Sequence, residues 1–147
     1  MKDDIRTVRF EPFHLKLFAE GREYGRADVS PEFRAMMYRQ VDGVTVLLGK
    51  EIAGCFGICR VWDGVAEATL VPSDVFYTKP KLFTRFTRGL LDVAAKTYNL
   101  HRIQALCLEK YPKHGRFIRA LGFEKEGVIR GYDPQKNDYG MYARLWS

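Results

Sequence analysis

Residues 80–108 read PKLFTRFTRGLLDVAAKTYNLHRIQALCL, and two different periodicities follow one another in this stretch. Its first part, Pro80–Tyr98, has apolar residues at helical spacing and basic residues on the opposite face, which predicts an amphipathic helix. The part from His101 to Leu108 is apolar and has the length of a strand, so it predicts a buried strand. A helix followed at once by a buried strand is typical of a β-helix-β crossover within a sheet.

Strand and turn patterns flank this stretch. The dipeptides Asp42-Gly43 and Asp63-Gly64 are turn signals, and they bracket apolar runs that predict an antiparallel meander. The predicted strands are Ile5–Phe10, Val44–Gly49, Ile52–Trp62, Val65–Val71, His101–Leu108, Val128–Arg130 and Met141–Trp146. The predicted helices are Phe13–Glu20, a helix that starts at Ser30, Pro80–Tyr98 and Pro112–Leu121. This order predicts an α/β protein of the α+β type, with a mixed central sheet of about seven strands flanked by about four helices.

Length and composition restrict the class of protein. A chain of 147 residues predicts a single domain over residues 1–147. Because 46% of the residues are hydrophobic and 29% are charged, the chain is neither disordered nor fibrous. The apolar runs are only of strand length and the first residues lack an apolar stretch, so we expect neither a membrane span nor a signal peptide. The three cysteines lack the spacing of metal ligands, and reduced thiols are typical of the cytoplasm, where we expect this protein.

The positive charge is concentrated in one part of the chain. The whole sequence has 24 Lys and Arg against 18 Asp and Glu, a net charge of +6. Residues 79–119 contain ten basic and two acidic side chains, so this segment alone carries +8. Such a segment suits an anionic partner, either a phosphorylated small molecule or nucleic acid, or it forms a solvated helix face. No recognised nucleic-acid motif is present, which disfavours the second of these partners.

Three blocks of sequence resemble the GNAT acyltransferase superfamily. They are LLDVAAKTYNLHRIQA at 90–105, LGFEKEGV at 121–128 and MYARL at 141–145. The closest likeness is to the branch that acetylates protein N-termini, including those of ribosomal proteins. The resemblance covers residues 65–147 through these blocks and the first 60 residues through strand order. It implies the GNAT fold, acetyl-CoA as cofactor, and an amine acceptor, most simply a protein N-terminus or a lysine.

The resemblance also locates a cofactor loop that departs from the family pattern. The family's Arg-Gly-x-Gly-x-Ala motif, which binds the CoA pyrophosphate at a helix N-terminus, falls on Thr78–Phe83. Lys79 and Lys81 replace its two glycines, and Pro80 removes a backbone donor. Either the lysines replace the lost N–H contacts while Arg85 or Arg88 binds the nucleotide phosphate, or cofactor binding has been lost. The cofactor residues that the resemblance assigns are Val71, Thr78, Lys79, Lys81, Leu82, Phe83, Arg85, Tyr111 and Phe117.

Acetyl transfer also requires a base for the amine and an acid for the departing thiolate. One GNAT pattern uses a Glu and a Tyr whose positions hold Leu106 and Ile118 here, so that pattern is excluded. In the N-terminal branch, the acid falls on His114 and the base on Asp133, and Glu67 is a third candidate that would orient the amine. The competing interpretations are a helix N-terminal residue for His114, a turn residue for Asp133 and a solvent-facing strand residue for Glu67.

Two further hypotheses compete with the enzyme. The lost glycines and the replacement of the pantetheine-binding Asn by Tyr111 are compatible with a catalytically inactive GNAT-fold structural or interaction protein. Small phage-encoded proteins resemble this superfamily with a similarly degenerate loop, so a phage virion component is the alternative to a cytoplasmic enzyme. A nucleic-acid-binding protein is the third hypothesis, and it predicts affinity that falls steeply with salt.

Overall fold

A computed structural model describes residues 4–11, 13–16 and 42–147. The predicted helix that starts at Ser30 and the end of the predicted helix Phe13–Glu20 lie outside the described residues. The chain divides into two compact units, one made of residues 1–59 with 68–80 and the other of residues 60–67 with 81–147. The single domain over residues 1–147 therefore stays a prediction.

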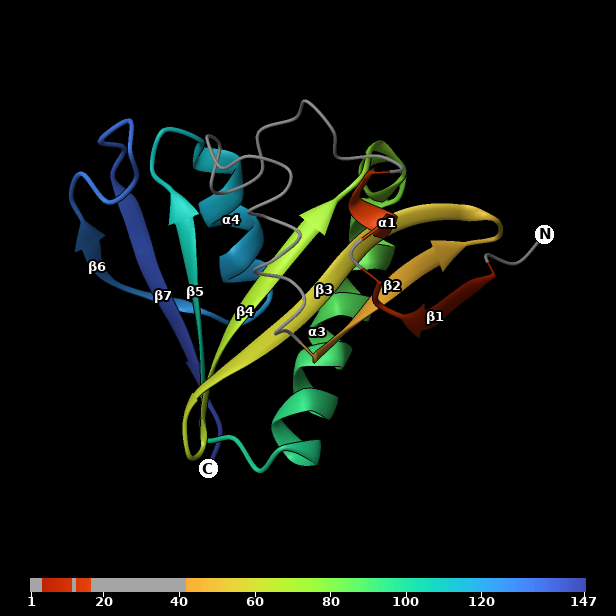
Figure 1. Ribbon diagram of the computed structural model, residues 1–147, viewed down its shortest axis with the longest axis horizontal. Coiled ribbons are helices and arrows are strands. Elements are labelled where there is room, and N and C mark those ends of the chain that lie inside the picture. The colour runs from red at the N-terminus through yellow and green to blue at the C-terminus, as the bar shows by residue number, and fades with distance from the viewer. Residues whose placement is uncertain (1–3, 12, 17–41) are drawn as a thin grey trace. The chain divides into compact units, whose positions relative to one another are not determined.

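The first unit is built on an antiparallel meander (Figure 1). Its elements are β1 (Ile5–Arg9), α1 (Phe13–Lys16), β2 (Asp42–Leu48), most of β3 (Glu51–Trp62), the second part of β4 (Val65–Pro72) and the 3₁₀ turn η1 (Asp74–Thr78). β1 pairs antiparallel with β2, and β2 pairs antiparallel with β3 through a bulge at Val46/Leu47. The backbone of β4 approaches Gly54 on β3 so closely that a Cβ atom at Gly54 would lie 2.9 Å from the carbonyl oxygen of Val71.

The second unit contains the predicted crossover. It holds the first part of β4, α3 (Pro80–Thr97) from Lys81 onward, β5 (Arg102–Leu108), α4 (Pro112–Ala120), β6 (Glu124–Ile129) and β7 (Tyr139–Leu145). The parallel ladder between β4 and β5 joins Val65–Glu67 to Arg102–Gln104, and β7 pairs antiparallel with both β5 and β6. The strands follow the order β1-β2-β3-β4-β5-β7-β6 in a seven-stranded mixed sheet, which confirms the predicted α+β class.

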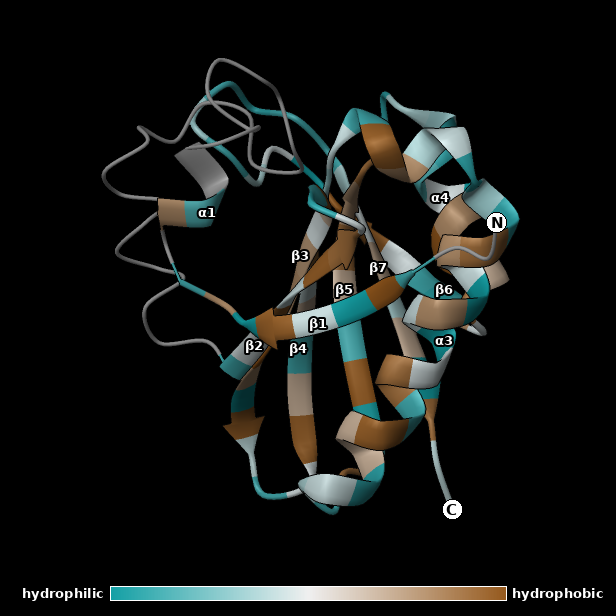
Figure 2. Ribbon diagram, turned by 90° about the vertical axis from the view of Figure 1, so that its right-hand side faces the viewer, coloured by the Kyte–Doolittle hydropathy of each residue, from teal (hydrophilic) through white to brown (hydrophobic). Residues whose placement is uncertain are grey.

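Helix α3 has the two faces that the sequence predicts. Phe83, Leu91 and Ala95 are buried, whereas Arg85 and Lys96 are exposed. Hydrophobic residues recur along α3 between hydrophilic ones, as the brown and teal segments of Figure 2 show. Burial of this apolar stripe, more than helix propensity, stabilises a helix of this kind.

Three strand predictions were wrong at their starts, and η1 was not predicted. β2 begins at Asp42, two residues before the predicted Val44, because Asp42 and Gly43, which were expected in a turn, pair with Ile58 and Gly57 on β3. β6 begins at Glu124 and not at the predicted Val128. The prediction missed its first residues because they are charged and exposed and show no apolar alternation. β7 begins at Tyr139, two residues before the predicted start, because Tyr139 and Gly140 pair with both β5 and β6. No helix among the described residues is long and apolar enough to cross a lipid bilayer.

Candidate functional site

The start of α3 is the first part of the candidate site. Ser73 caps η1, since its Oγ accepts a hydrogen bond from Val75 N at 3.2 Å and donates one to Ile52 O at 2.5 Å. Thr78 Oγ1 donates to Val75 O at 2.6 Å. Helix α3 then begins directly at Pro80, with no acidic residue in its first turn and with Lys79 and Lys81 exposed on either side. The helix dipole and the lysines therefore both place positive charge at this end.

The other predicted cofactor residues differ in what they offer to a ligand. Val71 and Phe83 are each only 1% exposed, so their side chains belong to the core and only their backbone is available. Leu82 and Phe117 are half-buried, and Arg85 is exposed. Arg88, the alternative to Arg85 for a phosphate, instead donates to Ala120 O at 3.1 Å.

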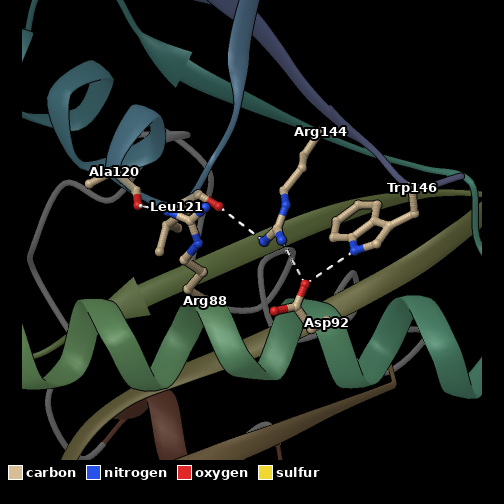
Figure 3. A network of polar contacts seen from close by, with 6 residues as sticks. All are labelled: Arg88, Asp92, Ala120, Leu121, Arg144 and Trp146. Carbon is tan, nitrogen blue, oxygen red and sulfur yellow. Dashed lines mark hydrogen bonds and ion pairs between the residues drawn. The ribbon is translucent and has the colours of Figure 1, made fainter.

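A polar network joins α3 to β7 and to the end of α4 (Figure 3). Arg144 Nη2 lies 2.6 Å from Asp92 Oδ1, and Arg144 Nη1 donates to Leu121 O at 3.1 Å. Trp146 Nε1 also donates to Asp92 Oδ1, at 3.1 Å, and the Arg144 guanidinium stacks 4.5 Å from the Trp146 ring centroid. These contacts hold the middle of α3 in place within the second unit.

His114 and Tyr111 are brought together at the start of α4. Tyr111 precedes the helix and Pro112 is its first residue, a position where the missing N–H costs nothing. His114 N donates to Tyr111 O at 3.0 Å, and the two rings lie 5.2 Å apart between centroids. Both side chains are half-buried, so the helix start presents an imidazole and a phenol side by side.

Asp133 organises the loop between β6 and β7. Its Oδ1 accepts hydrogen bonds from the backbone N–H groups of Gln135 and Asn137, and its Oδ2 accepts from Asn137 Nδ2 and from the Tyr139 hydroxyl. Desolvation acts to raise the pKa of Asp133, but the hydrogen bonds from Asn137, Tyr139 and Gln135 outweigh it and lower the pKa below its ordinary value. The carboxylate is therefore a weak base with four donors around it.

Glu67 lies next to a cluster that sequence reasoning missed. It is half-buried on β4 and stands opposite Gln104 in the parallel ladder. Gln104 Oε1 accepts from Arg102 Nε at 3.1 Å, and Arg102 binds Glu126 with two hydrogen bonds of 2.9 and 2.7 Å. The Arg102 hydrogen bonds lower the pKa of Glu126, so that pair stays ionised. The separation of Arg102 and Glu126 along the chain left no local signal for this pair.

Comparisons with solved structures identify the fold. No protein-family model matches the sequence, and no curated protein matches it. A GNAT-family acetyltransferase from Bacillus anthracis is similar over 99% of this chain and 97% of its own, with a TM-score of 0.73 and 17% identity. An IAA acetyltransferase from Bacillus cereus is similar over 97% of this chain and 100% of its own, with a TM-score of 0.76 and 12% identity. A mutant spermidine N-acetyltransferase from Vibrio cholerae is similar over 96% of this chain and 93% of its own, with a TM-score of 0.75 and 15% identity. The chain therefore has the predicted GNAT fold.

Proposed function

We propose that this chain is an acetyl-CoA-dependent N-acetyltransferase that acts on an amine. The observation that carries the proposal is the start of α3, where a capped turn leads into a long helix. Lys79 directly precedes this helix, Lys81 lies in its first turn, both are exposed, and the first turn has no acid. A helix N-terminus with added cations is a site for a diphosphate, and CoA carries one. The fold, which this chain shares with acetyltransferases, supports the same cofactor.

Lys79, Lys81 and Arg85 are the residues that would hold the phosphates. Pro80 and the absence of the two glycines remove backbone donors, and three long cationic side chains can replace them without a close approach of the backbone. Arg88 is held by the carbonyl oxygen of Ala120, which favours Arg85 as the arginine for the nucleotide phosphate. Thr78, Leu82, Val71, Phe117 and Tyr111 would supply the remaining cofactor contacts.

The chemistry requires one proton acceptor and one proton donor. The amine nitrogen attacks the thioester carbonyl carbon, the C–N bond forms, the C–S bond breaks, and CoA leaves as a thiolate. Glu67 or a water that it orders receives the amine proton, and His114 protonates the thiolate. Asp133 is the second candidate base, but its four hydrogen bonds favour the ionised form and reduce its affinity for a proton.

The resemblance favours a protein N-terminus, as in the ribosomal-protein branch, or a lysine as the acceptor. Polyamines are a second class to test, since one similar structure is a spermidine acetyltransferase. We infer that the enzyme acts in the cytoplasm. The competing candidate is an inactive GNAT-fold interaction or structural protein of phage origin. Pro80 and the missing glycines favour it, since phage-encoded proteins that resemble this superfamily have a similarly degenerate loop.

Calorimetry with acetyl-CoA tests the proposal. We expect binding to the unmodified chain and a loss of at least about tenfold in affinity in Lys79→Gln/Lys81→Gln, because two charge-assisted contacts are removed. Lys96→Gln is the matched control, since Lys96 is an exposed lysine of the same helix roughly 22 Å from Lys81 at 1.5 Å per residue. Absence of binding at millimolar acetyl-CoA would contradict the enzyme and leave the inactive GNAT-fold protein.

The acceptor is then identified by mass spectrometry. Purified protein with acetyl-CoA is incubated separately with peptides that have free N-termini, with N-terminally blocked peptides that contain lysine, and with spermidine. A mass increase of one acetyl group on the first peptide set alone supports the N-terminal assignment, whereas acetylation of spermidine alone contradicts it.

A further inference from the structure

A pocket of about 220 Å³ lies within the second unit, between α4 and the strands β5, β6 and β7. Among the residues that line it are Glu109, Tyr111, Arg116, Arg119, Lys125 and Tyr142. Only Tyr111 also belongs to the residues assigned to acetyl-CoA, so neither the cofactor loop nor the catalytic candidates use this pocket.

Two glycines leave the space that the pocket's polar groups occupy. A Cβ atom on Gly140 would lie 2.7 Å from Glu109 Oε1, and a Cβ atom on Gly115 would lie 2.7 Å from the Tyr142 hydroxyl oxygen. Glu109 Oε1 is shielded from solvent and forms an ion pair with Lys125 Nζ at 2.5 Å. The polar wall is therefore built by packing at Gly140 and Gly115, and it is not a chance meeting of surface side chains.

The pocket carries an excess of positive charge. Three basic side chains and one acidic side chain line it, a net charge of +2. Arg116 forms no hydrogen bond or ion pair with the residues that the structure describes, and the Arg119 guanidinium lies 5.5 Å from the Tyr142 ring centroid. Burial raises the pKa of the neighbouring Cys107 thiol to about 11, so this group adds no negative charge at neutral pH.

We propose that this pocket binds a compact oxyanion, a phosphate or a carboxylate, carried by a small molecule other than acetyl-CoA. Arg116 and Arg119 are three residues apart on α4 and therefore on one face, so both guanidinium groups can donate to the same anion. The Tyr142 hydroxyl and Lys125 provide further donors at the strands. The volume is below the roughly 300–1,000 Å³ of sites for drug-sized ligands, which suits a small anionic group.

The test uses the whole chain and ¹H–¹⁵N spectra at constant ionic strength. Inorganic phosphate and acetate are titrated in parallel with chloride. We expect saturable shift changes with phosphate or acetate at the amides of Gly115, Arg119 and Lys125, and no saturation with chloride. Arg116→Gln/Arg119→Gln should weaken this binding at least about tenfold, because two charged donors are lost. Lys113→Gln, an exposed lysine of α4 outside the pocket, is the control and should not change it.

A second arm separates this ligand from the cofactor. Phosphate titrations are repeated with saturating CoA, and independent binding of the two supports a separate site. Displacement of phosphate by CoA would show that the anion is part of the cofactor and would overturn the proposal. Non-saturable shifts, or shifts that the double substitution leaves unchanged, would also overturn it. The phosphate and acetate titrations and their variants need neither CoA binding nor acetyl transfer, so their outcome is independent of the proposed function; only the second arm requires that the chain binds CoA.

Discussion

Replacing Arg144 with alanine is expected to lower the free energy of unfolding by about 2 to 3 kcal/mol, because this side chain joins three elements of the second unit. Its ion pair with Asp92 contributes about 0.5 to 1 kcal/mol, since the Asp92 side chain is 53% exposed and solvent weakens the attraction. The hydrogen bond to Leu121 O adds about 1 kcal/mol. Stacking on Trp146 adds about 0.5 to 1 kcal/mol.

Urea denaturation of matched variants measures this loss. Asp92→Asn keeps an acceptor for Trp146 and removes only the charge, so we expect a loss of at most about 1 kcal/mol. Asp63→Asn, at an exposed turn where Asn-Gly is as favourable as Asp-Gly, should stay within about 0.5 kcal/mol of the unmodified protein.

Two results would contradict this role of Arg144. One is a loss below about 0.5 kcal/mol in Arg144→Ala, since a change of this size is ordinary for a surface residue. The other is a double variant, Arg144→Ala with Asp92→Asn, whose loss equals the sum of the single losses within about 0.3 kcal/mol, because contacting residues should not be additive.

Three further predictions concern the site and the thiols. The hydrogen bonds that lower the pKa of Asp133 stabilise the fold at pH values above 3.8, the ordinary pKa of an aspartate. In urea titrations the unmodified protein should therefore be more stable than Asp133→Asn at neutral pH, and this difference should disappear as the pH falls through the lower pKa of Asp133 in the folded state. An unchanged difference in strong acid would contradict this. His114→Gln should lower kcat by about 10² to 10⁴ with little change in the KM for acetyl-CoA, and an unchanged kcat would remove His114 from the chemistry. Cys59 is exposed, whereas burial raises the pKa of Cys55 and Cys107 to about 11, so a maleimide should label Cys59 first in timed mass spectrometry, and equal rates would contradict the burial.

Local periodicity carried most of the fold prediction. The stripe of α3 and the apolar run of β5 are visible in sequence because each residue's neighbours at helical or strand spacing already share one face. β6 was misplaced because a charged edge strand has no such pattern, and its strand conformation depends on hydrogen bonds to β7. The start of η1 likewise depends on Ser73, whose hydroxyl reaches Ile52 on β3.

The α+β order, the basic segment and the positive start of α3 can be predicted from the sequence, because they follow from residue types at near positions along the chain. Which charged side chains already have partners depends on tertiary contacts. The fold pairs Arg88 with Ala120 O, surrounds Asp133 with donors from its loop, and builds the pocket at Gly115 and Gly140. A side chain's availability depends on partners up to 54 residues away along the chain, as between Asp92 and Trp146, and the spacing of residues in the sequence does not show which of them meet in space.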